Sequence, residues 1–342
     1  MEYQILWFIL WGVLWAVYFM LDGFVMGAGM LHNFLGSNDG EKRVMINTIG
    51  PVWEGNEVWL VTAGGVTFAA FPTTYALMFS AMYTALVLLL CALIIRGVSY
   101  EFRSKEEWPL WKSCWDTAIM FGNFFPALLF GVAFGNIFAG LPIDATGFHG
   151  SILTLLNPYG LLTGALFVLL FMVHGALYLT VKTTGDLSRR AYIIANRLWP
   201  VLLIVAVTFL VATQYATKLY GNYLAKPLLL IIPLLAVASL LGIRVLSAQG
   251  KPLAALAASS LTILMVVGTG VAGLFPNMIP SSIDPAYSLT IVNSSSSLYT
   301  LKIMTVVAAI FVPIVIGYKI WIYRIFRAPV RVEEVLADKH AY

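Results

Sequence analysis

Charged residues are scarce in this chain of 342 residues, and their scarcity excludes most classes of protein. Only 11% of the residues are charged, while 60% are hydrophobic and the mean hydropathy is +0.88. A typical soluble domain carries about 25% charged and about 45–50% apolar residues. A soluble fold of this composition has too few polar side chains to cover its surface, so soluble and disordered proteins are excluded. The composition indicates a helical membrane protein that crosses the bilayer several times.

Cysteine and histidine are also scarce. The two cysteines, Cys91 and Cys114, lie in or beside apolar runs and indicate neither a disulfide framework nor a zinc site. The four histidines are spread along the chain, at His32, His149, His174 and His340. Only His174 lies well inside an apolar run, and one such histidine does not hold a chain of several haems. The net charge of +4 includes no basic run, so nucleic-acid binding is unsupported.

Long apolar runs dominate the sequence. A membrane-spanning helix needs about 20 largely apolar residues. Nine runs meet this length, at approximately 5–31, 53–71, 73–95, 116–139, 159–181, 198–217, 227–246, 253–275 and 301–324. The second and third are separated only by the turn Phe71-Pro72-Thr73, but together they are too long for one span. Because backbone in lipid must satisfy its own hydrogen bonds, we expect nine helices and an all-α polytopic fold.

The basic residues predict the orientation of the chain. Cytoplasmic loops of membrane proteins are enriched in Lys and Arg. With the N-terminus outside and the C-terminus in the cytoplasm, seventeen of the twenty basic residues fall on the cytoplasmic side. Only Lys218, Lys226 and Lys302 remain outside. An even number of spans would destroy this segregation, so it supports nine.

A few ionisable residues lie within the apolar runs, where each costs about 2.5–3.5 kcal/mol on insertion scales. They are Asp22, Glu54, Glu57, Asp116 and His174. In the predicted orientation all five fall in the cytoplasmic half of the membrane. A one-sided set of protonatable groups that ends inside the bilayer is what proton delivery from the cytoplasm to a buried reaction requires. We therefore predict that these five residues line a proton path.

Structural roles compete with this interpretation. Glu54, Glu57 and Asp116 open their predicted spans, and acidic residues stabilise helix N-termini by about 0.3–1 kcal/mol. Asp22 lies in the middle of a span and cannot be a cap, which leaves a functional role or a specific polar pairing. His174 is either a hydrogen-bonded core histidine or part of the path. Pairs of glycines four residues apart, such as Gly131 and Gly135, predict close helix packing within the chain.

Several motifs resemble one family. The segments LDGFVMGAGM (21–30) and NTIGPVWEGNEVWLVTAGG (47–65) are similar to subunit II of the cytochrome bd quinol oxidases. Further similar segments follow in order along nearly the whole chain: FRSK (102–105), GVAFGN (131–136), LLNPYGLLTG (155–164), HGALYL (174–179), LFPNMIPSS (274–282) and SLTIVNSSSS (288–297).

The resemblance implies two four-helix bundles and one peripheral helix. These would be residues 5–139, residues 159–275 and the helix 301–324, followed by a cytoplasmic tail at 325–342, all in one integral membrane domain. It also implies a bacterial inner-membrane complex that oxidises quinol, reduces O2 to water and generates a proton motive force. Its larger subunit I would carry two b haems and haem d, and this subunit would support assembly, line part of the proton path and bind no haem itself.

Further partners implied are quinone and membrane lipid, and the resemblance is compatible with a small accessory subunit. Residue by residue, the acid of the family's W-acid-G-N motif is Glu54, and the acid before the glycine-rich stretch is Asp22. Some relatives carry a second acid where Val25 stands, and valine cannot relay a proton. Other relatives carry glutamine in place of His174, which argues against an obligatory ligand. Without the resemblance, a proton-coupled secondary transporter or a purely structural scaffold would also fit the composition and the buried acids.

Overall fold

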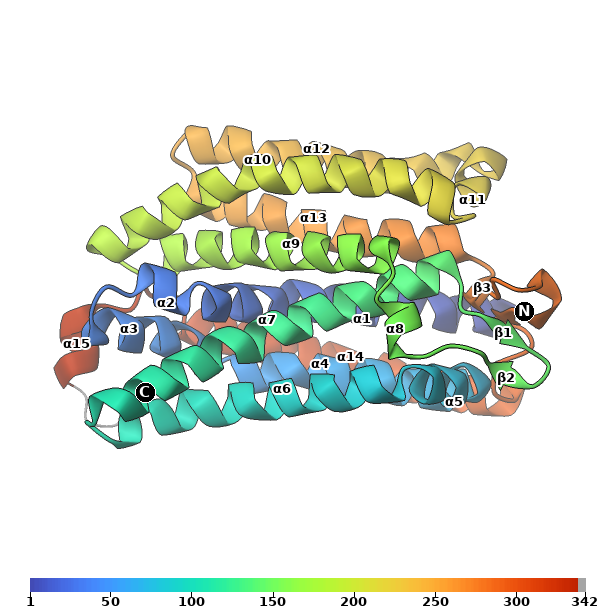
Figure 1. Cartoon of the computed structure of the whole chain (residues 1–342), viewed down its shortest axis with the longest axis horizontal. Coiled ribbons are helices and arrows are strands. Elements are labelled where there is room, and N and C mark those ends of the chain that lie inside the picture. Colours follow the sequence, from blue (N-terminus) through green and yellow to red (C-terminus); the bar gives the residue numbers. More distant parts are fainter. Residues whose placement is uncertain (338–342) are drawn as a thin grey trace.

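Long helices run side by side along the molecule (Figure 1). The computed structural model describes residues 1–337, and within them eight helices are long and apolar enough to cross a membrane. They are α1 (Glu2–Met30), α6 (Tyr83–Phe102), α7 (Pro109–Ala139), α9 (Pro158–Lys182), α10 (Gly185–Ala216), α12 (Ile231–Ala248), α13 (Pro252–Leu274) and α14 (Leu298–Ile325). The polytopic helical fold expected from the composition is therefore confirmed.

Short elements gather at the two ends of these helices. We name the ends inner and outer after the predicted orientation. The inner end holds α2 (His32–Leu35), α3 (Asp39–Ile49), η1 (Arg103–Lys105) and α15 (Val332–Ala337). The outer end holds α5 (Pro72–Ala81), β1 (Ile143–Asp144), β2 (Gly147–Phe148), α8 (Ile152–Leu155), α11 (Tyr220–Ala225), η2 (Pro227–Leu230), β3 (Asn277–Ile279), η3 (Pro285–Tyr287) and β4 (Leu289–Thr290). Strands β1 and β2 pair antiparallel, as do β3 and β4.

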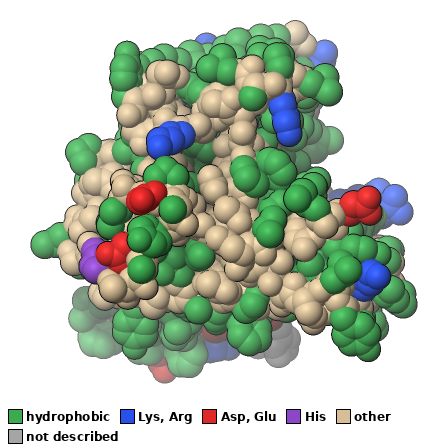
Figure 2. Space-filling model, turned by 90° about the vertical axis from the view of Figure 1, so that its right-hand side faces the viewer, with side chains coloured by type: hydrophobic (Ala, Val, Ile, Leu, Met, Phe, Trp, Pro, Cys, Tyr) green, Lys and Arg blue, Asp and Glu red, His purple; other side chains and the backbone are tan. Residues whose placement is uncertain are grey.

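The outer end carries little charge. Figure 2 shows this face, where scattered charged side chains interrupt a surface of hydrophobic and uncharged atoms. The inner end instead holds a dense set of ion pairs among α2, α3, η1 and the start of α7. This asymmetry agrees with the distribution of basic residues in the sequence.

Helix α4 (Trp53–Ala70) is a further long helix, but it is less apolar than these eight. Its first turns carry Glu54, Asn56 and Glu57, which lower the mean hydropathy of an 18-residue helix. It packs against α1, which holds it beside the apolar helices. The count of nine spans therefore stays a prediction that depends on α4.

The predicted span 73–95 was wrong in its boundaries. Residues 72–81 form the separate helix α5, the chain breaks at Met82, and α6 continues to Phe102. The apolar run appeared to end before Arg96 because a charged residue normally stops a span. Arg96 is fully buried within α6, so the helix passes through it.

Two other predicted spans begin too late. Helix α7 starts at Pro109, so Asp116 lies two turns inside it and is not a helix cap as one alternative proposed. Helix α10 starts at Gly185, well before the apolar run at 198. In both cases a polar helical segment extends the apolar run at the inner end. The apolar run in the sequence is therefore shorter than the helix.

Close contacts between helices involve glycine, as the spacings predicted. A Cβ atom on Gly27 of α1 would lie 1.8 Å from the Phe171 carbonyl oxygen of α9. A Cβ atom on Gly131 of α7 would lie 2.6 Å from the Cα of Gly164 on α9. Since lipid tails are as apolar as side chains, packing of this kind rather than the hydrophobic effect holds helices together in a membrane.

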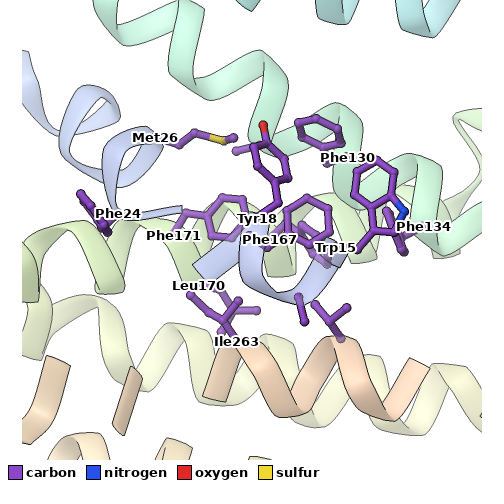
Figure 3. Close-up of a cluster of buried hydrophobic side chains, with 14 of the residues drawn as sticks. Trp15, Tyr18, Phe24, Met26, Phe130, Phe134, Phe167, Leu170, Phe171 and Ile263 are labelled. Carbon is purple, nitrogen blue, oxygen red and sulfur yellow. The ribbon is translucent and has the colours of Figure 1, made fainter. Parts of the chain in front are cut away.

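An aromatic cluster fills the centre of the molecule (Figure 3). It includes Trp15 and Phe19 of α1, Phe134 of α7 and Phe167 of α9, whose rings meet mostly edge to face. Helix α1 also packs against α13. The two halves of the chain are thus joined through α1, α7 and α9, and their division into two bundles stays a prediction.

Candidate functional site

A buried ion pair joins α1 to α6. Asp22 lies eight residues before the end of α1, about 12 Å from its inner end. The Arg96 Nη1 atom donates to Asp22 Oδ2 over 2.9 Å, and both side chains are fully buried. The specific polar pairing that the sequence left open for Asp22 is therefore present, and its partner is a residue that sequence reasoning assigned to a cytoplasmic loop.

A second carboxylate shares the same guanidinium. Glu57 Oε1 of α4 lies 3.3 Å from Arg96 Nη2, and the Glu57 side chain is 24% exposed. Two carboxylates thus face one cation. If both are ionised the group carries one excess negative charge, and a proton taken up by either carboxyl leaves it neutral. We call Asp22, Glu57 and Arg96 the central triad.

Several polar atoms around the central triad have no hydrogen-bond partner among the described residues. They are Asp22 Oδ1, Arg96 Nε and the Tyr18 hydroxyl. Most buried polar groups are bonded to protein or to ordered water, and leaving one unpaired costs about 1–3 kcal/mol. Tyr18 lies near enough to Asp22 for the two groups to interact electrostatically. These atoms are therefore the positions at which water would complete the network.

The start of α4 places Glu57 and Glu54 differently. Asn56 Nδ2 donates to the Leu21 carbonyl over 2.8 Å, which fixes α4 against α1 beside Asp22. The Tyr323 hydroxyl of α14 donates to Asn56 Oδ1 over 2.9 Å. Glu54 lies in the first turn of the helix and its side chain is exposed on the surface of the chain. Only Glu57, one turn later, reaches Arg96.

Helix α6 and the η1 turn that continues it carry a polar stripe toward the inner end. Arg96, Tyr100 and Arg103 are spaced by four and three residues, so they share one face of the helix. The Tyr100 hydroxyl donates to Asn123 Oδ1 of α7 over 3.0 Å, and both residues are buried. Arg103 lies about 10 Å farther along than Arg96, at 1.5 Å per residue. The i, i+7 spacing of the two arginines is the sequence signal that could have identified the stripe.

Asp116 lies at the centre of a second cluster, at the inner end of this stripe. His32 Nε2 lies 2.7 Å from its Oδ1, Lys42 Nζ lies 2.8 Å from its Oδ2, and Arg103 Nε also pairs with it. Burial lowers the pKa of His32, although hydrogen bonding to Asp116 opposes the shift. Both Asp116 oxygens are engaged, so this carboxylate links α2, α3 and η1 to α7.

Asp39 at the start of α3 forms an outer layer of the same cluster. It lies 3.0 Å from Arg103 Nη2 and 3.2 Å from Lys112 Nζ. Partial burial would raise the pKa of Asp39, but the Arg103 and Lys112 cations outweigh burial and hold it below its ordinary value. These ion pairs hold α3 and its loop to the ends of α6 and α7.

His174 lies on the opposite side of α1 from Arg96. Its Nδ1 is 3.0 Å from Ser259 Oγ and its Nε2 is 3.1 Å from the Met20 carbonyl oxygen. Both ring nitrogens therefore have protein partners, which does not fit a haem-iron ligand. Within residues 1–337 there is also no group of three or more His, Cys, Asp or Glu residues placed to bind a metal ion. His340 lies outside the described residues.

The structure thus brings only some of the five predicted residues together. Asp22 and Glu57 meet at Arg96, Glu54 lies nearby on the surface, and Asp116 and His174 belong to other surroundings. Sequence reasoning missed several residues that complete these networks: Tyr18, His32, Lys42, Arg96, Tyr100, Arg103 and Asn123.

Comparison with known proteins identifies relatives along the whole chain. The sequence profile of the family described as cytochrome bd terminal oxidase subunit II matches residues 3–326. The chain is 39% identical over 332 residues to cytochrome bd ubiquinol oxidase subunit 2 of Bacillus subtilis, covering 96% of this chain and 97% of that protein. It is 36% identical over 378 residues to cytochrome bd-I ubiquinol oxidase subunit 2 of Escherichia coli, covering 99% of each.

A solved structure has the same fold. The bd oxidase from Geobacillus thermodenitrificans contains a chain that superimposes with a TM-score of 0.78 over 95% of this chain and 99% of that one, at 17% sequence identity. Identity this low supports the fold alone. The sequence matches supply the rest: this chain belongs to the family of cytochrome bd terminal oxidase subunit II.

Proposed function

We propose that this chain is the subunit of a bacterial quinol:oxygen oxidoreductase that lines its cytoplasmic proton path and supports assembly of the haem-bearing subunit I. The family membership supports the enzyme complex. The observation that carries the proton path is the central triad, in which two carboxylates share one buried arginine about 12 Å from the inner end of α1. The complex would lie in the cytoplasmic membrane, with quinol as its electron donor.

The two b haems and haem d are assigned to subunit I. They would supply electron transfer and the reduction of O2 when bound in the complex. Among the described histidines only His174 lies deep in a spanning helix, and both of its ring nitrogens are engaged, by Ser259 and Met20. His32 is engaged by Asp116. The engagement of these two histidines therefore supports a haem-free subunit.

The partner subunit is assigned to the surface of α4 and α14. Glu54 is exposed there, and an ionised carboxylate facing hydrocarbon would cost about 2.5–3.5 kcal/mol. Lys319 of α14 approaches Gly55, so its cation lies beside the start of α4. Along α14, large apolar side chains such as Phe311 and Ile314 are also exposed. Polar groups of a second subunit would cover Glu54 and receive the protons that pass it.

Protons would move between Glu57 and Asp22 and leave toward the partner at Glu54. Because protonation of either carboxyl neutralises the central triad, the group holds one extra proton at low electrostatic cost. Water bonded to Asp22 Oδ1 and the Tyr18 hydroxyl would connect the carboxyls. Val25, where some relatives carry an acid, is buried and apolar, so no relay passes through that position.

Asp116 and His174 were also predicted from the sequence to line the path. Their polar atoms are engaged by protein partners, which is what a structural role requires. We therefore assign the relay to Asp22, Glu57 and Glu54, and assign Asp116 to holding the inner end together. The nine spans, the outside N-terminus and the two bundles are part of the same proposal, and the path depends on them for its cytoplasmic entrance.

The test uses the purified oxidase complex with Asp22→Asn or Glu57→Gln in this chain. Each variant removes one proton-accepting group and keeps the side-chain size. We expect a slower rate of quinol-dependent O2 consumption with an unchanged haem spectrum. Glu107→Gln, which removes an exposed carboxylate at the inner end, serves as the control and should keep the full rate.

Unchanged rates at full haem content in both variants would contradict the proton path. Loss of haem from the variants would instead support the assembly role alone. A colourless preparation of the single chain that is active in uptake would favour the proton-coupled transporter over the oxidase.

A further inference from the structure

An apolar surface groove lies between α6 and α7, away from the central triad. It has a volume of about 430 Å³ and nearly all of its lining is apolar. Its walls include Leu88 and Ile95 of α6 and Phe121 and Phe125 of α7, each about 45–50% exposed. The groove is therefore open along its length to the surroundings of the helices.

The inner limit of the groove is set by a close helix contact. At Gly122 of α7, an added Cβ atom would lie 3.0 Å from the backbone N and Cα of Arg96 on α6. Toward the outer end the space between the two helices is large enough to form the groove. Helix α8 lies over that end, and its Ile152 and Leu155 complete the lining (Figure 1).

A polar hollow adjoins the groove at its outer end. This hollow has a volume of about 150 Å³ and shares Met82, Ala85, Ile152 and Leu155 with the groove. Its other walls carry the hydroxyl groups of four residues: Ser80, Tyr83, Thr84 and Ser151. None of its lining residues is charged. A polar mouth thus opens directly into an apolar groove.

The length of the groove matches one leaflet of a membrane. Its α6 wall runs from Ala85 to Ile95, which is about 15 Å at 1.5 Å per residue. The hydrocarbon core of a bilayer is about 30 Å thick. The groove therefore reaches from the outer interface to about the midplane, where Gly122 and Arg96 close it.

We propose that the groove and the hollow form a binding site for one glycerophospholipid of the outer leaflet. One acyl chain would occupy the groove between α6 and α7. The ester and phosphate oxygens would accept hydrogen bonds from Tyr83, Thr84 and Ser151, since the Ser80 hydroxyl already donates to the Leu77 carbonyl oxygen. Because the hollow has no charged side chain, the site selects for an acyl chain at this depth and not for the charge of the headgroup.

The first test measures lipid retained by the purified oxidase complex, using native mass spectrometry. Ala133→Phe places a ring in the groove, and Ala238→Phe, on the exposed side of α12, is the matched control. Displacing about two methylene groups from the groove should lower phospholipid occupancy by about tenfold in Ala133→Phe only. Equal occupancy in both variants, or an isoprenoid quinone as the retained molecule, would overturn the proposal.

The second test uses the native thiols, so that a variant that fails to assemble leaves the proposal testable. Cys91 lines the groove and is exposed, while Cys114 is exposed outside it. Delipidation should accelerate maleimide labelling of Cys91, and vesicles of palmitoyl-oleoyl phosphatidylcholine should reverse the effect. The ratio of Cys91 to Cys114 labelling is the readout. A ratio that does not respond to lipid removal and addition would contradict the site.

Discussion

Arg96 follows an apolar run in the sequence, and in the structure its guanidinium pairs with Asp22 of α1 and Glu57 of α4. Its burial also explains why α6 continues beyond the apolar run. A buried charge is tolerated when it is paired and costly when it is not. Arg96 therefore holds α1, α4 and α6 together by pairing with the Asp22 and Glu57 carboxyl groups.

Replacing Arg96 alone should destabilise the complex more than replacing Arg96 and Asp22 together. Arg96→Met leaves the Asp22 carboxyl buried without its cation, with an expected cost of about 3–5 kcal/mol. The double variant Arg96→Met, Asp22→Leu replaces the pair by apolar side chains and should recover much of that stability. Thermal unfolding of the detergent-solubilised complex measures both. A double variant no more stable than Arg96→Met would refute the pairing.

Because of Glu41 at the inner end, we expect the free energy of unfolding to depend on pH. Burial alone would raise the pKa of Glu41, but the Arg190 guanidinium and the Ser37 N–H outweigh burial and hold it below its ordinary value. A lowered native pKa adds stability above the pKa of the unfolded state, and that stability is lost as the pH falls through the native value. At neutral pH the ionised Glu41 carboxylate therefore makes its full contribution to stability.

Glu41→Gln should accordingly lower the thermal midpoint at pH 7, and the difference from the unaltered chain should shrink as the pH falls below 4. Melting curves at a series of pH values would measure this difference. The matched control is Asp186→Asn, which alters an exposed ion pair. A Glu41→Gln difference that is constant with pH would contradict the role of the carboxylate charge.

At the scale of elements, α1 and α9 pack backbone to backbone. Gly27 lies against the Phe171 carbonyl and Gly175, and a Cβ on Gly175 would in turn lie 2.4 Å from the backbone of α1. Neither position accepts a side chain unless the helices separate. Since α9 also carries His174 and α1 carries Asp22, this contact sets the spacing between the central triad and the second half of the chain.

Gly27→Ala should therefore destabilise the chain by about 1–3 kcal/mol or more, as overpacking of a tight contact does. Gly242→Ala on α12 is the control, because its added Cβ would meet only Ala258 at 3.9 Å. There, alanine should be neutral or stabilise the helix by about 0.5–1 kcal/mol. Thermal unfolding of each variant complex provides the comparison, and equal melting temperatures would disprove the tight contact.

At the scale of the whole molecule, ion pairs gather at one end and apolar or uncharged surface at the other. The positive-inside tendency places the charged end in the cytoplasm. Alkaline phosphatase fused after Ser295, in the outer loop, should be active because the enzyme requires the oxidising exterior. The same fusion after Thr184, between α9 and α10, should be inactive. The reverse pattern of activities would show that the chain has the opposite orientation, and it would contradict a cytoplasmic entrance of the proposed path.

Much of the architecture could be predicted from sequence because the bilayer imposes a length and a polarity on each span. Eight of the predicted runs coincide with apolar helices, although α6, α7 and α10 extend beyond them into polar residues. The candidate site was predicted less completely. Asp22 and Glu57 stood out as acids in apolar runs, whereas Arg96 and Tyr100 carried no comparable signal near the end of a run.

The sequence by itself determined the class, the order of the helices and the family, because hydropathy and motif order are local properties of the chain. Only the tertiary structure decided which charges meet. Asp22 and Arg96 are 74 residues apart, and their pairing depends on α7 packing against both α1 and α6, which brings the Arg96 side chain within reach of Asp22. Likewise, Asp116 became part of an ion-pair cluster once α2, α3 and η1 converged on it. The partner of a buried charge is set by helix packing, and neither composition nor spacing records it.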